Sequence, residues 1–512
     1  MSFDFSPIFQ KTLSLLEDTS QNIFITGRAG TGKSTLLSYF REHTKKKVVI
    51  LAPTGVAALN IKGQTIHSFI KFKPGITFEK VKAIYKKDDP QNIYQKIEMI
   101  VIDEISMVRS DLLDCVDKSL RLNRGNHEPF GGVQMVFIGD LYQLPPVVSS
   151  SEREIFTTHY ASPYFFDAEV MQGMPLEFVE LEKIYRQKDD TFISLLNAVR
   201  NNSATEEHFA AINERYNPEF VPNPKKFFLY LTTTNALADE INSEALTKLK
   251  TKEYMYEGNA TGNFDNRAMP TDTALSVKVG AQIMMLNNDS AGRWVNGSIG
   301  KIVSVEKDEE EEDLLIIELS DGEMVEVARF TWELFEFKYD TDRKSLRSET
   351  IGTFTQYPLR LAWAVTIHKS QGKTFDRIII DLGRGTFAHG QLYVALSRCT
   401  TLAGIILKQP VAKHHIRMDW HVVKFITQFH YARSDAAMPL AEKIRILENA
   451  ASEQSAVRIV YLKANDEKSE RTIVPYQVGE MDYRGKKFFG VSAFDKKRGE
   501  DRVFRIDRIL EM

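Results

Sequence analysis

Two kinds of segment alternate along the first 180 residues. Apolar, largely β-branched runs occur at 23–26, 47–54, 98–106 and 133–140, as expected of buried parallel strands. Segments of helical character lie between these runs. Strands that alternate with helices predict a parallel α/β sheet. We therefore expect the first α/β lobe to occupy residues 1–180.

A second α/β set begins near residue 227 and resumes at 359–383. The stretch between its halves is rich in β-type residues and in turn signals such as Asn-Gly-Ser and Ser-Asp-Gly-Glu, which predicts a small inserted barrel. A final β-rich segment has basic residues interleaved with aromatic ones. The expected ranges are about 70–95 for a basic insert in the first lobe, 181–430 for the second lobe, about 295–355 for the barrel, 431–454 for a linking helix and 455–512 for the last module.

Composition limits the possible classes of protein. The chain has 512 residues, of which 43% are hydrophobic and 26% charged, which is ordinary for globular material. A net charge of -3 argues weakly against a protein that coats DNA, but a motor needs only one positive groove. No apolar run approaches a membrane-spanning length, so we expect no membrane partner. Cys115 and Cys399 are too few for a disulfide framework, and the lack of a targeting segment favours a prokaryotic cytoplasm.

The segment "FITGRAGTGKSTLL" has the spacing of a phosphate-binding P-loop. An apolar strand precedes the glycines and a helix begins after them, which is the context that the motif requires. Backbone N–H groups and the helix N-terminus would hold phosphates, Lys33 would reach the β/γ-phosphates, and Ser34 would bind Mg²⁺. The expected nucleotide contacts here are Gly27, Ala29, Gly30, Thr31, Gly32, Lys33, Ser34 and Thr35.

A pair of carboxylates, Asp103 and Glu104, closes the strand at 98–106. We assign Asp103 to the Mg²⁺ ion and Glu104 to the attacking water, because nucleoside triphosphate hydrolysis needs both functions. A base beside the metal ligand favours hydrolysis over transfer to a small substrate. The pair therefore points away from kinases.

Three more polar residues have the chemistry of a hydrolysis site. Gln143 follows a strand that ends in Gly-Asp, where an amide can sense the γ-phosphate. Arg186 and Arg398 each follow an expected helix or strand. Developing charge on the γ-phosphoryl group needs cations from across a cleft, so both arginines are candidates.

The ordered motifs "GRAGTGKS", "APTGVAALNIKGQTIHSF", "VIDEISMV", "GDLYQLPPV", "IYRQ", "LTTTN", "AVTIHKSQGKTFD" and "YVALSRC" together resemble the superfamily-one DNA helicases. Residues 111–140 resemble the signature segment of the Pif (petite integration frequency) family within the RecD-like branch. The resemblance covers about residues 5–410. It implies two RecA-like lobes, with a wedge in the first and a Src-homology-like barrel inserted into the second.

The resemblance also implies an activity: an ATP- and Mg²⁺-dependent helicase that moves 5′ to 3′ on single-stranded DNA and opens forked or tailed duplexes, active as a monomer. It adds Gln10 and Gly372 to the nucleotide contacts and places the wedge near Phe72. Carried over by position, the strand contacts are Thr54, Thr65, His67, Ser68, Phe69, Phe72 and Pro145 on one lobe, and Asn235, His368, Lys369, Ser370 and Gln371 on the other. Phe69 is expected to stack on bases.

Residues 457–512 resemble a WYL domain through "IVYL", "RTIVPYQV" and "RVFRIDRI", although Phe488-Phe489-Gly490 replaces the naming tripeptide. The resemblance implies a small β-barrel that binds nucleic acid or an anionic ligand. Arg471, Arg502 and Arg505 are the expected contacts.

Two other functions remain open at this stage. An RNA or RNA–DNA hybrid helicase is possible because the expected groove contacts the backbone rather than the sugar. An ATP-switched DNA-binding regulator is also possible, although a pure switch does not need Glu104.

Overall fold

The computed structural model describes residues 6–512 except 74, 87–88, 150–151, 153–155, 157, 224–225, 263, 265–268, 341–344 and 484. The chain divides into two compact units. One contains residues 1–196 and 206–417, and the other contains residues 197–205 and 418–512. Among the described residues, no helix combines the length and apolarity needed to cross a bilayer.

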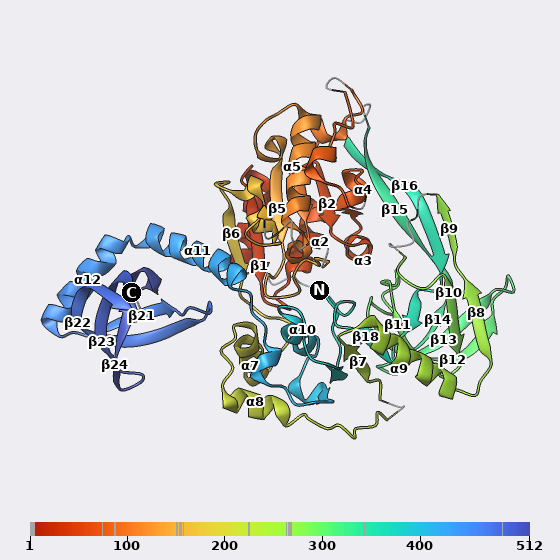
Figure 1. The fold of residues 1–512 in the computed structure, drawn as a ribbon. Coiled ribbons are helices and arrows are strands. Elements are labelled where there is room, and N and C mark those ends of the chain that lie inside the picture. The colour runs from red at the N-terminus through yellow and green to blue at the C-terminus, as the bar shows by residue number, and fades with distance from the viewer. Residues whose placement is uncertain are drawn as a thin grey trace. The chain divides into compact units, whose positions relative to one another are not determined.

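The first lobe is built on a parallel sheet, of which β1, β2, β5 and β6 are labelled in Figure 1. The sheet has six strands in the order β3-β2-β4-β5-β1-β6. The strand interiors are buried on both faces, which explains their continuous apolar runs. Its elements are α1 (Pro7–Asp18), β1 (Ile23–Gly27), α2 (Lys33–His43), β2 (Val48–Ala52), α3 (Gly55–Asn60), β3 (Gln64–Thr65), α4 (Ile66–Phe69), β4 (Met99–Ile102), α5 (Ser110–Arg124), β5 (Gln134–Ile138) and β6 (Glu177–Leu181).

The second lobe has a four-stranded parallel sheet with the order β18-β7-β19-β20. Both predicted α/β sheets are therefore present. The elements of this lobe are α8 (Glu206–Asn213), β7 (Leu229–Thr232), α9 (Asn235–Lys248), β18 (Ala364–Thr366), β19 (Ile378–Asp381), α10 (Gln391–Ser397) and β20 (Ile405–Leu407). Helix α7 (Asp190–Arg200) crosses the division between the two units.

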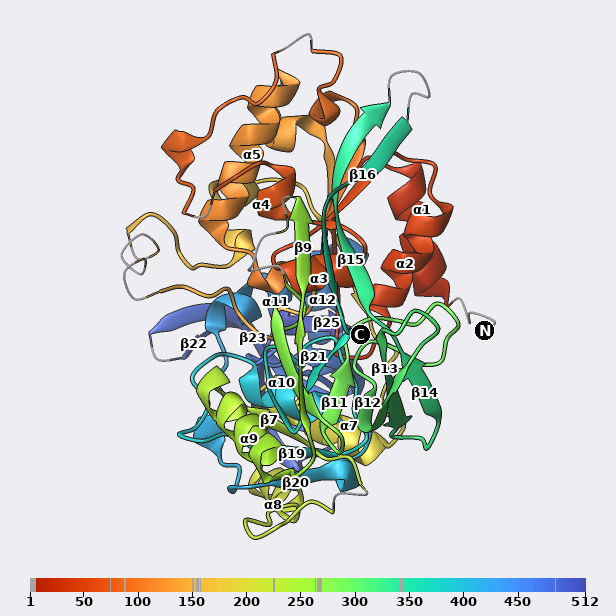
Figure 2. The same cartoon turned by 90° about the vertical axis from the view of Figure 1, so that its right-hand side faces the viewer.

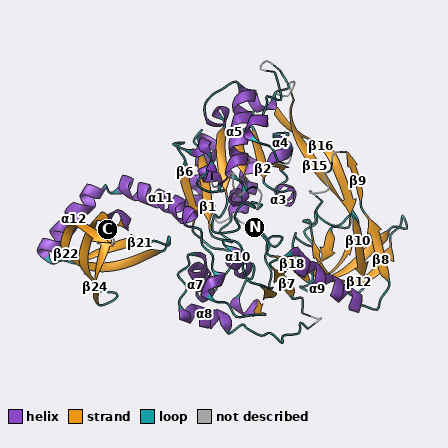
Figure 3. Cartoon of the chain, in the orientation of Figure 1, coloured by secondary structure: helices purple, strands orange, loops and turns teal. Residues whose placement is uncertain are grey.

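The insert between α9 and β18 is almost entirely β-structure (Figure 3). It begins at Glu253, well before the predicted 295, because its first strands come before the turn signals that suggested the boundary. Three antiparallel sheets form it, in the orders β10-β8, β14-β13-β12-β11-β17 and β15-β16-β9. The strands are β8 (Glu253–Glu257), β9 (Asn259–Gly262), β10 (Ala274–Lys278), β11 (Gln282–Met285), β12 (Ile299–Lys307), β13 (Asp313–Leu319), β14 (Met324–Val327), β15 (Phe330–Asp340), β16 (Ser345–Gln356) and β17 (Leu359–Leu361).

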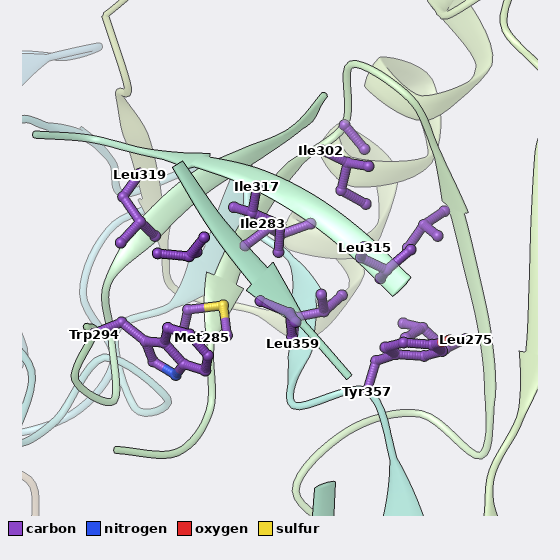
Figure 4. Close-up of a cluster of buried hydrophobic side chains, with 14 of the residues drawn as sticks. Leu275, Ile283, Met285, Trp294, Ile302, Leu315, Ile317, Leu319, Tyr357 and Leu359 are labelled. Carbon is purple, nitrogen blue, oxygen red and sulfur yellow. The ribbon is translucent and has the colours of Figure 1, made fainter. Parts of the chain in front are cut away.

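The insert has its own hydrophobic core. Ile283, Ile302, Leu315 and Ile317 are fully buried there, with Trp294 at one end (Figure 4). The long hairpin β15–β16 leaves this core and runs beside the first lobe (Figure 2). There the amide of Gln64 donates to the Phe335 carbonyl, and Lys71 pairs with Glu336 at 3.2 Å.

The second unit consists of two helices and an antiparallel sheet with the order β24-β23-β22-β21-β25. The single predicted linking helix at 431–454 is corrected to two helices, because the chain breaks the helix at Met438-Pro439. The elements are α11 (Trp420–Ala437), α12 (Leu440–Glu453), β21 (Val457–Leu462), β22 (Lys468–Tyr483), β23 (Lys486–Asp495), β24 (Glu500–Arg505) and β25 (Ile509–Glu511). Residues from α12 and the strands share one core.

Candidate functional site

The P-loop joins β1 to α2, as the sequence predicts. Gly30 and Gly32 have φ values of 80° and 88°, in the left-handed region that glycine tolerates. A Cβ atom on Gly30 would lie 2.5 Å from the Arg186 Cβ, so only glycine allows the Arg186 loop to approach this closely. Lys33 donates from Nζ to the carbonyls of Gly27 at 2.7 Å and Arg28 at 3.1 Å. These contacts hold Lys33 against the loop, in the arrangement that a phosphate-binding loop requires.

Asp103 and Glu104 follow β4 directly. The Glu104 N–H donates to Asp103 Oδ1 at 2.9 Å, and Glu104 itself has a left-handed backbone with φ of 50°. Burial, and then the negative charge of Asp103, raise the pKa of Glu104 to about 7. Burial also raises the pKa of Asp103, against the opposing charge of Lys33. The pair therefore lies within the electrostatic reach of the P-loop lysine.

The oxygens present fit Mg²⁺. Ser34 lies in the exposed first turn of α2, and hydroxyl and carboxylate oxygens are ligands that this ion prefers. Two half-buried carboxyls with raised pKa values would be stabilised in their ionised form by a divalent cation.

Side chains of the second lobe reach this site. Gln371 donates from Nε2 to Glu104 Oε2 at 3.0 Å and to Gln143 Oε1 at 3.4 Å. The Tyr393 hydroxyl, on α10, accepts from the Ala29 N–H of the P-loop at 2.9 Å. Gln371 was predicted to contact DNA, but the structure places it beside the hydrolysis base, and Tyr393 was not predicted at all.

The two candidate arginines lie close to each other. Arg186 donates to the Ser397 carbonyl at 3.3 Å, and Arg398 follows α10 and is only 1% exposed. Burial, and then the positive charge of Arg186, lower the pKa of Arg398 to about 9. Glu104 also acts on Arg398 electrostatically. The structure thus places Arg398 within the electrostatic reach of Glu104, and Arg186 within that of Arg398.

The remaining predicted nucleotide contacts differ in exposure. Gln10 lies on the exposed side of α1, and Thr35 is exposed in the first turn of α2. Thr31 is buried and donates to the Arg28 carbonyl at 2.9 Å, so its side chain supports the loop. Gly372 is exposed, with φ of 78°.

One aromatic residue at the mouth of this site was missed by sequence reasoning. Tyr185 is exposed, its N–H donates to the Gly30 carbonyl at 2.8 Å, and its ring is the nearest group to the space above Gly32. Its position next to Arg186 in "IYRQ" was the available signal.

Several of the predicted strand contacts of the first lobe gather at two helix starts. Thr54 caps α3 and Thr65 caps α4, so both hydroxyls lie at helix N-termini, where phosphates bind well. Ser68 is exposed and His67 is half-buried, and burial lowers the pKa of His67. The predicted base stacking by Phe69 is wrong, because its side chain is only 4% exposed.

Phe69 packs edge-on against Tyr94 and Phe337, at centroid distances of 5.3 and 6.5 Å. Its ring is therefore a core side chain and cannot stack on a base. Phe72 and Pro145 are half-buried. The predicted insert at 70–95 contains positions 74, 87 and 88, which lie outside the described residues, and its remainder forms short 3₁₀ turns and loops.

On the second lobe, Asn235 and Lys369 are exposed and His368 is half-buried. Burial lowers the pKa of His368, which favours a neutral ring. The predicted contact between Ser370 and the DNA strand is also corrected. The side chain of Ser370 is 0% exposed and its hydroxyl donates to the Ile367 carbonyl at 2.7 Å, because the turn folds the serine inward.

A further aromatic residue on this surface was missed. Phe387 is 58% exposed, and its ring lies 6.4 Å from that of His368 with an interplanar angle of 13°. Parallel rings at this surface have the chemistry of a base-stacking site. The available signal was a phenylalanine in the glycine-bounded loop "GRGTFAHG".

In the second unit, Arg502 and Arg505 are partly exposed, and each pairs with a neighbouring carboxylate, of Glu500 and Asp507 respectively. The prediction that Arg471 contacts nucleic acid is corrected. Arg471 is only 8% exposed, and it donates to Asp495 Oδ2 at 3.0 Å. Arg471 lies on the same strand face as buried Ile473, two residues along. The alternation of the strand, rather than its basic charge, decides its position.

Known proteins resemble this chain over most of its length. The PIF1-like helicase profile matches residues 4–209, and the WYL domain profile matches residues 442–512. The human ATP-dependent DNA helicase PIF1 is 33% identical over 429 residues, covering 81% of this chain and 62% of its own length. The Pif1 helicase of Bdellovibrio bacteriovorus is 31% identical over 414 residues, covering 79% of this chain and 88% of its own length. The chain thus spans less than two thirds of the human relative.

Solved structures of Pif1 helicases also resemble this chain. Bacteroides sp. Pif1 in complex with ADP-AlF4 has a TM-score of 0.76 and 36% identity, covering 84% of this chain and 97% of that one. The Bacteroides protein bound to single-stranded DNA has a TM-score of 0.61 with the same identity, and covers 83% of this chain and 97% of that one. Together with the nucleotide site built from both lobes, these likenesses show that the chain belongs to the PIF1-like helicase family and carries a C-terminal WYL domain.

Proposed function

We propose that this protein is an ATP-dependent DNA helicase that moves 5′ to 3′ along single-stranded DNA and separates the duplex ahead. The observation that carries the proposal is the hydrogen bond from Gln371 of the second lobe to Glu104 of the first. A nucleotide site assembled from two lobes closes when ATP binds and opens after hydrolysis. Strand-binding residues on both lobes then move relative to each other.

The chemistry of hydrolysis divides among the described residues. Lys33 and the P-loop N–H groups hold the phosphates, and Glu104 takes a proton from the attacking water. Ser34 and Asp103 would hold Mg²⁺, which supplies positive charge to the β/γ-phosphate oxygens. Arg186 and Arg398 stabilise the charge that develops on the transferred phosphoryl group.

We expect the substrate to be single-stranded DNA with forked or tailed duplex. A solved structure of Bacteroides Pif1 is bound to single-stranded DNA, and another Pif1 structure concerns DNA unwinding at forked double-stranded DNA by two coordinating Pif1 helicases, which supports this choice. Thr54, Thr65, Asn235 and Lys369 offer polar contacts to a backbone, and Phe387 adds an aromatic surface beside His368. Such contacts do not exclude structured DNA or an RNA–DNA hybrid. We expect the monomer to be the active form.

The WYL domain has an accessory role in this proposal. Arg502 and Arg505 remain its candidate DNA contacts, because both are partly exposed. Their neighbouring carboxylates reduce the net attraction for phosphate, so we expect a modest contribution to affinity.

Unwinding of two duplexes, one with a 5′ tail and one with a 3′ tail, tests the proposal. Strand release from the 5′-tailed duplex alone is the expected result. Release from neither duplex, without stimulation of ATPase by single-stranded DNA, would reject it, and release from an RNA-tailed duplex alone would favour the RNA reading. Glu104→Gln is the control, since it should bind ATP and DNA but lose turnover by about 10²- to 10⁴-fold.

A further inference from the structure

The turn that follows β18 is compact. Its backbone N–H groups bond back along the chain: Ser370 to Thr366 at 3.0 Å, Gln371 to His368 at 3.2 Å and Lys373 to Ser370 at 3.1 Å. Successive bonds of this kind make residues 367–373 a single stiff element. The turn therefore offers a continuous hydrogen-bonded route by which a displacement at one end can reach the other end.

Side chains anchor the inner face of this turn. The buried Ser370 hydroxyl donates to Ile367, and Lys373 donates from Nζ to Asn296 Oδ1 at 2.8 Å. The second contact joins the turn to the β-insert. The side chains of His368, Lys369 and Gln371 do not take part in these anchoring contacts.

Gln371 extends from the turn into the nucleotide site. Its amide nitrogen carries two protons, and the two acceptors within 3.4 Å are Glu104 Oε2 and Gln143 Oε1. One side chain of the second lobe therefore holds both the hydrolysis base and the amide that senses the γ-phosphate. A hydrogen bond to one carboxylate oxygen also restricts the direction in which the other oxygen points.

Glu104 needs such support. Its backbone is left-handed, with φ of 50° and ψ of 42°, a conformation that a glutamate keeps only where its surroundings hold it. Asp103 holds the Glu104 N–H, but the carboxylate lies at the end of a flexible side chain. The Gln371 amide is the contact across the lobes that restrains it.

The same turn presents His368 and Lys369 on the surface where the proposed DNA strand lies. His368 is parallel to the exposed Phe387 ring, and Lys369 is exposed. The backbone bond from Gln371 to His368 joins the two surfaces within one turn.

We infer that Gln371 is the positioning residue through which bound single-stranded DNA controls ATP hydrolysis, by orienting Glu104 from across the lobes. The inference rests on the proposed function, because it requires DNA to be the strand that occupies this surface. It replaces the expected contact between Gln371 and DNA. It also predicts that Gln371 affects turnover and leaves the binding of both ligands largely unchanged.

Steady-state ATPase with and without oligo-dT, together with oligo-dT binding, tests the inference in the full chain. Gln371→Ala should lower the DNA-stimulated kcat by about 10- to 100-fold, as expected for loss of a supporting hydrogen bond. KM for ATP and Kd for oligo-dT should stay within about twofold. Gln371→Glu keeps the size but faces Glu104 with a like charge, so it should not restore the rate.

A matched control is Gln282→Ala, since the Gln282 amide donates to the carbonyls of Phe228 and Ala362 in the same unit. It should leave the DNA-stimulated kcat near that of the wild type. In a Glu104→Asp background, whose carboxylate is withdrawn by one methylene, Gln371→Ala should add little further loss.

The outcomes distinguish failure of the proposed function from failure of the inference about Gln371. A wild-type chain with no DNA-stimulated ATPase rejects the proposed function itself. A stimulated wild type in which Gln371→Ala weakens oligo-dT binding but keeps kcat rejects the inference and restores Gln371 to the strand groove. Wild-type kcat in Gln371→Glu also rejects it, because size alone would then be sufficient.

Discussion

The nucleotide site and the WYL domain each bury an arginine that the sequence predicted to meet phosphate, and they do so differently. Arg398 donates to the Val394 carbonyl at 2.9 Å and to the Ser397 hydroxyl at 3.0 Å, and the described residues include no carboxylate within ion-pair distance of it. Arg471 has Asp495 at 3.0 Å. One buried cation is held by neutral groups and the other by a full negative charge.

The difference separates a binding cation from a structural one. A buried guanidinium without a carboxylate pays a desolvation penalty that an incoming anion can offset, and the lowered pKa of Arg398 has burial as its main cause. A buried arginine with its carboxylate is already neutralised, and removal of one partner leaves the other uncompensated. The sign of the neighbour, rather than the presence of an arginine, indicates the role.

The largest effect is expected at Arg398. Arg398→Ala should lower kcat for ATP by about 10³-fold or more, because charge on the phosphoryl group loses its cationic partner. Thermal unfolding should change little compared with this loss, and ATPase assays with saturating oligo-dT measure it. A decrease below tenfold would place Arg398 among the structural arginines.

Arg471→Ala should lower the stability of the WYL domain. Asp495 would remain buried without its cation, at a cost of about 3–5 kcal/mol. Hydrogen exchange of residues 457–511 in the full chain should accelerate by about 10²- to 10⁴-fold where global opening of this domain governs exchange. Replacing both partners by leucine should restore protection. Unchanged exchange together with weaker DNA binding would return Arg471 to the ligand-binding residues.

The same contrast applies to Phe387 and Phe69. Phe387→Ala should weaken oligo-dT binding by about 1–3 kcal/mol, because an exposed ring that stacks on a base is lost. Phe69→Ala should lower stability by about 3–5 kcal/mol through a cavity, and is the matched control. Equal affinity of Phe387→Ala and wild type, measured by fluorescence anisotropy, would remove Phe387 from the groove.

The last comparison concerns Lys373, a third cation, which is half-buried. Burial, and then the charge of Arg360, lower its pKa to about 7, against about 10.5 in an unfolded chain. The unfolded state therefore binds more protons between these values, so stability should rise with pH from about 7 to 10.5, by at most about 1.4 kcal/mol per pH unit. Urea midpoints at pH 7, 8 and 9 measure the slope. Lys373→Met should flatten it, and an unchanged slope would assign the titration elsewhere.

Local motifs were predictable because their chemistry depends on neighbours in sequence. The P-loop between β1 and α2, the carboxylates after β4 and Arg398 after α10 all lie where their motifs placed them. The two parallel sheets followed from apolar runs that alternate with helices. The boundary of the β-insert was less predictable, since strands such as β8 alternate apolar and polar residues weakly.

The errors share one cause. Phe69, Ser370 and Arg471 each have the side-chain chemistry of a nucleic-acid contact, yet each is buried. Whether a side chain faces solvent depends on what packs over it, and the contacts of Phe69 include Phe337, from a hairpin more than 250 residues away in sequence. The contact of Gln371 with Glu104 was not predictable for the same reason, because Glu104 belongs to the other lobe.

The sequence by itself determined the phosphate-binding loop, the carboxylate pair, the two α/β sheets and the family, because these depend on short-range spacing and on strand and helix periodicity. The tertiary structure alone decided which cations are neutralised, which aromatic rings remain exposed and which lobe supports the hydrolysis base. Those properties depend on burial and on contacts between distant segments, and both exist only after the chain has folded.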